Sequence, residues 1–154
     1  MKKEKDIYLI LDNIRSLHNV GAIFRTAEAT KIKKLYLCGL TGYPPRKEID
    51  KTALRTVAGV EWEYVKDITE VLKKLKKKKI QIIALEQRTG SVDYSKLKFK
   101  FPVAIIVGHE LYGVSERAIS YADLTVELPI YGRIAESLNV ATATGIMLYK
   151  LRES

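Results

Sequence analysis

Three clusters of polar residues each follow a run of apolar residues that predicts a strand, which is where α/β folds usually place their ligands. The first cluster lies in NIRSLHNVGAIFRTAEA, where Asn19 begins a predicted helix as its N-cap and Arg25 follows six residues later. A guanidinium in this mostly apolar helix is either an ion-paired surface group or an anion binder. The residue pattern alone favours the surface group.

The second cluster, VAIIVGHELYGVSE, follows the pattern of a buried strand. Gly108 would let a ligand approach the backbone closely, and Glu110 lies on the turn that follows. His109 has the chemistry of a general base near neutral pH, although a single His on a loop is more often a solvated side chain. The spacing matches neither G-x-G-x-x-G nor G-x-x-x-x-G-K-[ST], so hydride transfer and nucleotide hydrolysis lack support.

The third cluster lies in LPIYGRIAESLNVATATGIMLYKL, residues 128–151. Ser137 is predicted to be the N-cap of a helix that starts there, and by spacing alone Asn139 is also a capping residue. The small residues 141–145 that follow lower helix propensity without a local gain, so something must approach this helix closely. A ligand, a partner helix and a second chain each satisfy that requirement.

The elements that would position these clusters alternate between strand and helix. Strands are predicted at 7–11, 34–38, 80–85, 101–107 and 124–128, with an exposed or edge strand at 60–64; helices are predicted at 19–29, 51–58, 68–78 and 115–121 and from 137 onward; loops are predicted at 39–50 and 86–100. This order predicts an α/β fold with a mostly parallel sheet. A chain of 154 residues fits one domain, 1–154.

Composition limits the class of protein and its partners. The chain is 47% hydrophobic and 29% charged, which is typical of a soluble globular protein, and no apolar run approaches the roughly 20 residues of a membrane span. A single cysteine, Cys38, and two histidines favour a cytoplasmic protein without a metal site. The net charge of +9 fits either a nucleic-acid partner or a merely lysine-rich composition. The lysine run at 73–79 is more often a solvated helix face than an RNA contact.

Together the three clusters resemble the SpoU, or TrmH-like, family of SPOUT-class RNA ribose 2′-O-methyltransferases over nearly the whole chain. The matching residues are Asn19, Gly21, Arg25, Thr26 and Ala27 in the first motif, Gly108, Glu110 and Gly113 in the second, and Pro129, Gly132, Ser137, Leu138, Asn139 and Val140 in the third. Their order and strand context carry the resemblance. It implies an α/β domain with a deep C-terminal trefoil knot and a homodimer. Many members of the family carry an extra N-terminal RNA-binding domain, whereas this chain is expected to have no separate RNA-binding domain.

The resemblance also implies the chemistry, which is methyl transfer from S-adenosylmethionine to a ribose 2′-hydroxyl of tRNA or rRNA. Arg25 is then expected to position the nucleotide or to act as base, and Asn19 to orient Arg25 or the substrate. Glu110, Ser137 and Asn139 are expected to organise the loops and the catalytic edge. The expected cofactor contacts are Leu85, Glu86, Gly108, Glu110, Ile130, Ser137, Leu138 and Asn139.

The sequence departs from the family pattern at a few positions. His109 stands where the family most often has Asn, and Tyr112 occupies a turn position often held by a smaller residue. These departures bear on the substrate and on the shape of the pocket. Two alternatives stay open: a non-catalytic RNA-binding or assembly protein that keeps the fold, and an RNA methyltransferase that acts on a base nitrogen.

Overall fold

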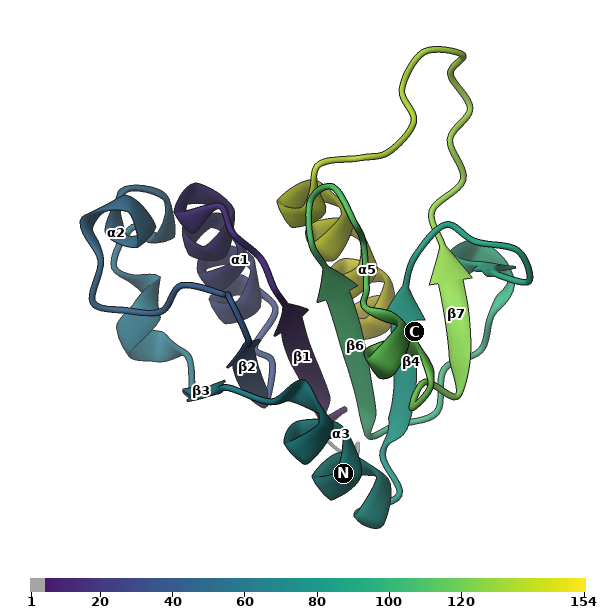
Figure 1. Cartoon of the computed structure of the whole chain (residues 1–154), viewed down its shortest axis with the longest axis horizontal. Helices are drawn as coiled ribbons and strands as arrows, with labels where there is room; N and C mark the ends of the chain where they lie inside the picture. The colour runs from purple at the N-terminus through teal and green to yellow at the C-terminus, as the bar shows by residue number, and fades with distance from the viewer. Residues whose placement is uncertain (1–4) are drawn as a thin grey trace.

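The computed structural model describes residues 5–154 and shows one seven-stranded sheet whose strand pairs all run parallel (Figure 1). The strands are β1 (Ile7–Asp12), β2 (Lys34–Cys38), β3 (Trp62–Val65), β4 (Gln81–Leu85), β5 (Val92–Asp93), β6 (Val103–Gly108) and β7 (Leu124–Glu127). Their order across the sheet is β3-β2-β1-β6-β4-β7-β5. The predicted α/β class with a parallel sheet is therefore confirmed, and the strand at 62–65 does lie at an edge.

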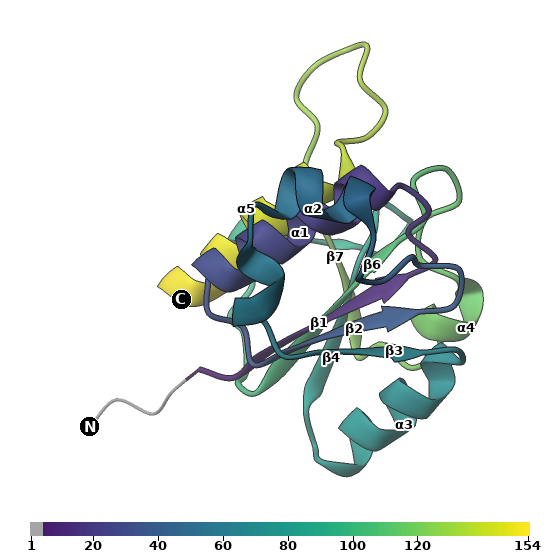
Figure 2. The same cartoon turned by 90° about the vertical axis from the view of Figure 1, so that its left-hand side faces the viewer.

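Helices cover both faces of the sheet (Figure 2). They are α1 (Leu17–Ala29), α2 (Lys47–Ala53), α3 (Ile68–Lys77), α4 (Glu116–Ile119) and α5 (Val140–Glu153), with short 3₁₀ turns at Thr56–Gly59 and Tyr94–Lys96. α1 and α5 pack on one face, and α3 and α4 pack on the other. Both faces of the central strands are therefore shielded from water.

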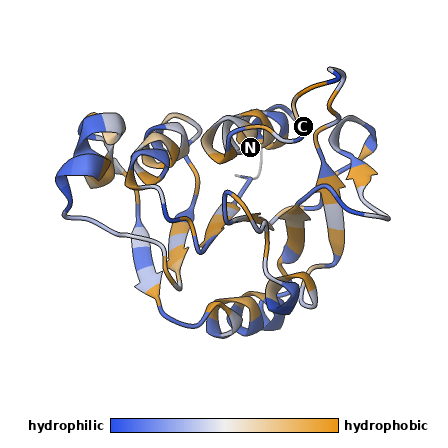
Figure 3. Cartoon of the chain, turned by 45° about the horizontal axis from the view of Figure 1, so that its top comes forward, coloured by the Kyte–Doolittle hydropathy of each residue, from blue (hydrophilic) through white to orange (hydrophobic). Residues whose placement is uncertain are grey.

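The alternation of side chains along each strand creates two apolar cores. In β1, Leu9 and Leu11 join the core under α1 and α5, whereas Ile10 joins the core under α3. In β6, Ile105 and Ile106 divide in the same way, because successive side chains of a strand point to opposite faces. Figure 3 shows the resulting apolar strands between amphipathic helices. This explains why the central strands read as continuous apolar runs.

Two helices begin at residues other than those predicted. The N-cap of α1 is Ser16, whose hydroxyl accepts a hydrogen bond from the Asn19 N–H at 3.2 Å, so Asn19 lies inside the helix. The N-cap of α5 is Asn139, whose side-chain oxygen accepts from the N–H groups of Ala141 and Thr142. The prediction that Ser137 caps this helix was wrong. In both cases two good capping residues stand close together, and tertiary contacts select one of them.

Two predicted loops contain short regular elements. The segment 39–50 ends in the first turn of α2, which starts at Lys47 and ends at Ala53 rather than spanning 51–58. The segment 86–100 contains the two-residue strand β5 and a 3₁₀ turn. α2, β5 and the 3₁₀ turn are each too short to give a clear periodic sequence pattern.

The chain between β7 and α5 leaves the sheet at its carboxyl edge, projects beyond it and returns to the face that carries α1 (Figures 1 and 2). The trefoil knot implied by the resemblance concerns how this segment is threaded, and it stays a prediction. No helix within residues 5–154 is both long and apolar enough to cross a membrane.

Candidate active site

A pocket of about 320 Å³ opens at the carboxyl edge of the sheet, where β4, β6 and β7 end and α5 begins. This is the edge at which parallel α/β sheets bind ligands. All eight residues predicted as cofactor contacts lie in its wall: Leu85, Glu86, Gly108, Glu110, Ile130, Ser137, Leu138 and Asn139. Residues from three distant parts of the sequence thus meet around one cavity, and their role as cofactor contacts stays a prediction.

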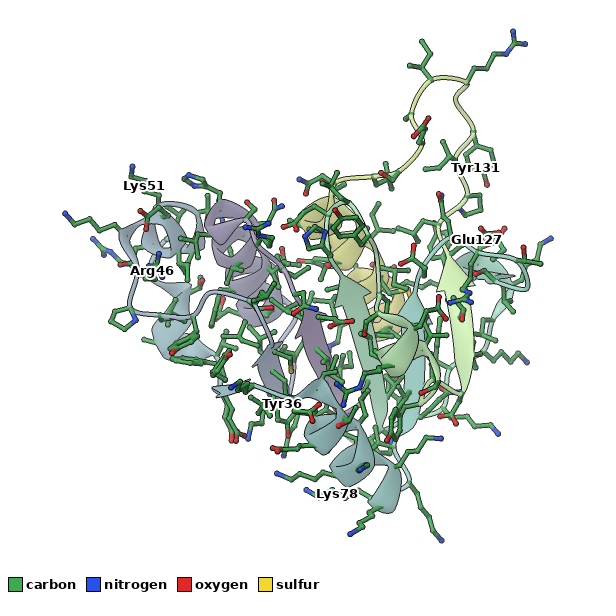
Figure 4. All side chains as sticks on the ribbon, in the orientation of Figure 1. Tyr36, Arg46, Lys51, Lys78, Glu127 and Tyr131 are labelled. Atoms are coloured by element: carbon green, nitrogen blue, oxygen red, sulfur yellow. The ribbon has the colours of Figure 1, made fainter. Side chains whose placement is uncertain are left out.

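The charge of the pocket is opposite to that of the chain. Its wall contains Glu86, Glu110 and Glu127, and none of the residues that line it within the described chain is Lys or Arg. Figure 4 shows Glu127 at the end of β7, beside the pocket's edge of the sheet. In a protein of net charge +9 this acidic lining favours a ligand that carries positive charge.

Glu110 is held by N–H donors from the first cluster. Its Oε1 accepts from the Ser16 N–H at 3.0 Å and from the Asn19 amide at 3.4 Å, and its Oε2 accepts from the Arg15 N–H at 3.3 Å. Burial tends to raise the pKa of Glu110, but the hydrogen bonds from its own N–H, Ser16, Arg15 and Asn19 outweigh burial and lower that pKa. Glu110 is therefore a carboxylate at neutral pH that fixes the loop before α1.

Asn19 and Asn139 join the first and third clusters directly. The side-chain amide of Asn139 donates to the side-chain oxygen of Asn19 at 3.2 Å, while the Asn139 oxygen caps α5. Because Asn19 also donates to Glu110, a continuous chain of hydrogen bonds runs through Glu110, Asn19 and Asn139. These three predicted site residues are brought together on one side of the pocket.

The loop after β6 is fixed by close backbone contacts. A Cβ atom on Gly108 would lie 2.2 Å from the Val114 nitrogen, so only glycine fits there. Gly113 has φ of +71°, and the Val114 N–H that follows it donates to Glu86 at 2.7 Å. Glu86 is thus a structural acceptor as well as part of the pocket wall.

Two acidic residues at this edge of the sheet were not among the predicted site residues. Asp12, which is only 3% exposed, accepts from the Ser115 N–H at 2.8 Å and so anchors the end of the β6 loop to β1. Glu127 adds the third carboxylate of the pocket. Each is the last residue of a parallel strand, and that position was the signal available in the sequence.

Arg25 lies away from this pocket. It is exposed on the outer face of α1, in a shallow groove with Thr26, Lys51 and Tyr149. Six helical residues separate it from Asn19, which corresponds to about 9 Å along the axis and about 240° around it. Asn19 and Arg25 therefore face different surroundings within one chain. Ser137 lines the pocket but is exposed in the projecting segment.

The fold and the site together define an α/β protein with a ligand pocket at the carboxyl edge of a parallel sheet. The sequence pattern of the SpoU rRNA Methylase family matches residues 6–149, and the chain belongs to this family.

Two proteins of Aquifex aeolicus and Sinorhizobium meliloti illustrate the relationship. A tRNA (guanosine(18)-2′-O)-methyltransferase of A. aeolicus is 33% identical over 152 residues, which cover 97% of this chain and 70% of the relative. The crystal structure of an A. aeolicus TrmH/SpoU tRNA modifying enzyme superposes with a TM-score of 0.87 at 33% identity, over 99% of this chain and 76% of that one. An AdoMet-bound rRNA methyltransferase of S. meliloti superposes with a TM-score of 0.88 at 31% identity, over 99% of this chain and 58% of that one.

Proposed function

We propose that this chain transfers the methyl group of S-adenosylmethionine to a ribose 2′-hydroxyl of RNA. The observation that carries the proposal is that the second and third motifs line one acidic pocket, whose wall holds Glu110 and Asn139, and that Asn19 of the first motif hydrogen-bonds to both of these residues. The names of the relatives support the same activity, since one is a tRNA 2′-O-methyltransferase and another was crystallised with AdoMet.

The pocket suits S-adenosylmethionine in size and charge. A volume of about 320 Å³ lies at the lower end of the range for small-molecule sites. Leu85, Leu138 and Val140 offer apolar surface for a purine ring, and the carboxylates Glu86 and Glu127 suit the ammonium and sulfonium groups. When bound, the cofactor supplies an electrophilic methyl group.

The chain's own residues then have to hold and orient the RNA ribose. The three-residue hydrogen-bonded chain Glu110–Asn19–Asn139 positions the start of α1 against the start of α5, at the mouth of the pocket. Both carboxylate oxygens of Glu110 already accept N–H donors, so Glu110 organises the site rather than removing the hydroxyl proton. Arg25 is left with one of the two roles that the resemblance implies, placement of the nucleotide or removal of the hydroxyl proton.

The position of Arg25 makes a homodimer part of the proposal. Apolar side chains are exposed on α5 and just after α2, with Leu54 at 53%, Tyr149 at 49% and Ile146 at 38% exposure, and Leu54 and Tyr149 line the same groove as Arg25. A second copy packed on this face would cover that apolar surface. The same packing offers a route by which Arg25 of one copy serves the pocket of the other.

The RNA is proposed to be tRNA in the cytoplasm, on the analogy of the A. aeolicus relative. The net charge of +9 supports a polyanionic substrate of either RNA type.

Methyl transfer is tested with labelled S-adenosylmethionine and separated tRNA and rRNA that lack their native methylation. We expect calorimetric binding of the cofactor and a label on the ribose of tRNA. Cofactor binding without transfer to either RNA would favour the non-catalytic alternative, and label mapped to a base nitrogen would favour the base methyltransferase.

The role of Arg25 is tested by Arg25→Ala, which should abolish transfer while leaving cofactor affinity nearly unchanged. Normal methylation by this variant would refute the assignment. Mixed dimers then decide whether Arg25 serves the pocket of its own chain or the pocket of the other chain. They combine Arg25→Ala chains with Ala143→Phe chains, whose pocket is filled. Activity recovered in the mixture shows that Arg25 acts across the dimer, because each parent dimer lacks one part.

A further inference from the structure

The rim of the pocket carries an aromatic stack that the proposed reaction does not use. In the loop after β6 the rings of His109 and Tyr112 stack with their centroids 4.8 Å apart and an interplanar angle of 30°. His109, Leu111 and Gly113 line the pocket, so Tyr112 lies in the loop that forms this part of the pocket wall. One face of the Tyr112 ring is covered by the imidazole of His109.

The stack is held in place by the backbone of its own loop. His109 Nδ1 accepts hydrogen bonds from the N–H groups of Leu111 at 3.0 Å and Tyr112 at 3.2 Å. The loop is closed by a pair of backbone bonds between His109 and Gly113, at 2.8 and 3.0 Å. The imidazole thus acts as a spacer that fixes the direction of the Tyr112 ring.

Tyr112 is nevertheless 84% exposed. Single exposed apolar side chains are common and by themselves carry no implication. The contact with the imidazole restricts this ring before anything binds, so a flat partner that stacks on it costs less side-chain entropy. The open face of Tyr112 is therefore a prepared surface for a planar group.

We propose that Tyr112 stacks on an unpaired base of the RNA substrate, at or next to the nucleotide whose ribose is methylated. The inference rests on the proposed function, because the cofactor fills the pocket and the substrate must then arrive at its mouth. Aromatic side chains bind unpaired RNA bases by stacking, and the interaction tolerates different bases. Tyr112 is thus a positioning residue for the substrate.

An exposed cation next to the loop that carries the stack agrees with an RNA partner. The backbone N–H of Arg15, in the loop before α1, donates to Glu110, which lies in the loop that carries the stack. The Arg15 side chain is exposed. The nearby charge of Glu110 is engaged by N–H donors, which reduces its repulsion of a phosphate. Arg15 is therefore suited to pair with the phosphate of the stacked nucleotide.

Steady-state transfer to an unmodified tRNA transcript tests the stacking. Tyr112→Leu should raise KM for the transcript by roughly 5- to 100-fold, which corresponds to the loss of one base stack. Tyr112→Phe and Tyr112→Trp should keep KM near the wild-type value, and the cofactor affinity of all three variants should be unchanged. An unchanged KM for Tyr112→Leu, or equal losses for Phe and Leu, would overturn the proposal.

Fluorescence gives a readout that a merely structural role would not affect. The wild-type chain has one tryptophan, Trp62, so the Tyr112→Trp variant adds a second emitter at the pocket mouth. Stacking of a base should quench the added emission when the transcript binds, relative to the wild type. Absence of extra quenching at saturating transcript would contradict the stacking.

The charge beside the stack is tested by salt dependence. Arg15→Gln should reduce the slope of log Kd against log salt by about 0.7, the value for one phosphate contact with a single strand. Lys66→Gln is the matched control, since Lys66 is an exposed cation after the edge strand β3. An unchanged slope for Arg15→Gln would remove Arg15 from the proposal. A wild type that transfers no methyl group would instead refute the proposed function, independently of Tyr112.

Discussion

Glu110 couples the proposed site to pH through hydrogen bonds that need its charged form. Because the pKa of Glu110 is lowered in the folded state, its stabilising effect is present above its ordinary pKa of 4.5 and is lost as pH falls through the lower folded value. Glu110→Gln should therefore lower the free energy of unfolding at pH 7 by about 1 kcal/mol, a charge-assisted hydrogen-bond contribution reduced for its exposure to solvent.

Urea denaturation of the wild type and Glu110→Gln at pH 7 and near pH 3 measures this effect. The difference between the two proteins should shrink at the acidic pH, where the wild-type carboxyl group becomes protonated. Glu61→Gln serves as a control, because Glu61 is an exposed carboxylate outside the site. A difference that does not change with pH would show that Glu110 acts through shape rather than charge.

Asn139 makes two kinds of hydrogen bond, and different substitutions remove one kind or both. Its oxygen caps α5, and its amide donates to Asn19. Asn139→Ala should lower the free energy of unfolding by about 1 kcal/mol through loss of the cap, whereas Ser137→Ala should leave stability within about 0.5 kcal/mol. Asn139→Asp should keep the stability but slow methyl transfer, since aspartate caps the helix without donating to Asn19. Equal stability of Asn139→Ala and Ser137→Ala in chemical denaturation would refute this division.

The residues of the site were predicted unequally well from the sequence. The grouping of Gly108, Glu110 and Asn139 came from the family resemblance, because spacing alone describes each as a turn or cap residue. Local propensity could not choose between Ser137 and Asn139 as the helix cap, since both types cap well. The choice depends on Asn19, which lies 120 residues away in the chain.

At the scale of elements, the contact between α1 and α2 depends on the absence of a side chain at Gly21. A Cβ atom there would lie 2.0 Å from the Thr52 hydroxyl and 2.2 Å from the Ile49 carbonyl oxygen. Gly21→Ala should therefore push α2 away and lower the free energy of unfolding by roughly 1–3 kcal/mol, despite the better helix propensity of alanine.

Gly145→Ala is the matched control in the interior of α5. Its Cβ would approach Thr26 at 3.6 Å, an ordinary van der Waals contact, so the gain in helix propensity should leave stability unchanged or slightly higher. Thermal unfolding of the two variants should thus give shifts of opposite sign, or a clear loss for Gly21→Ala only. Loss of stability in both would mean that helix packing does not distinguish the two glycines.

The long strands were predictable because their signal is a property of the element itself. The runs at 34–38, 80–85 and 101–107 are apolar over most of their length, as is typical of buried parallel strands, and the observed bounds differ by two residues at most. α2 and β5 were mispredicted because each is short and is stabilised mainly by its neighbours. α2 rests on α1 at Gly21, and β5 pairs with β7.

For the whole molecule, the direction of the strands places the acidic pocket and the lysine run at 73–79 toward opposite edges of the sheet, which the net charge alone does not reveal. The helix α3 runs from the carboxyl edge after β3 back to the amino edge before β4, so the lysine run at 73–79 extends toward the edge opposite the pocket. Figure 4 shows Lys78 at the far end of the molecule from Glu127 and Tyr131. The net charge of +9 alone therefore does not identify the surface that binds RNA.

This separation predicts that the lysine run is a solvated helix face. A nucleotide at the pocket mouth lies at the other edge of the sheet, so Lys73, Lys76 and Lys77 should not touch the phosphates around it. The triple variant Lys73→Gln, Lys76→Gln, Lys77→Gln should keep the wild-type kcat and the wild-type slope of log Kd against log salt for the tRNA transcript, whereas Arg15→Gln lowers that slope. A fall of the triple variant's slope by about 2 or more would show that the RNA also extends over α3 toward the amino edge, because each lost phosphate contact removes about 0.7–0.9 from the slope.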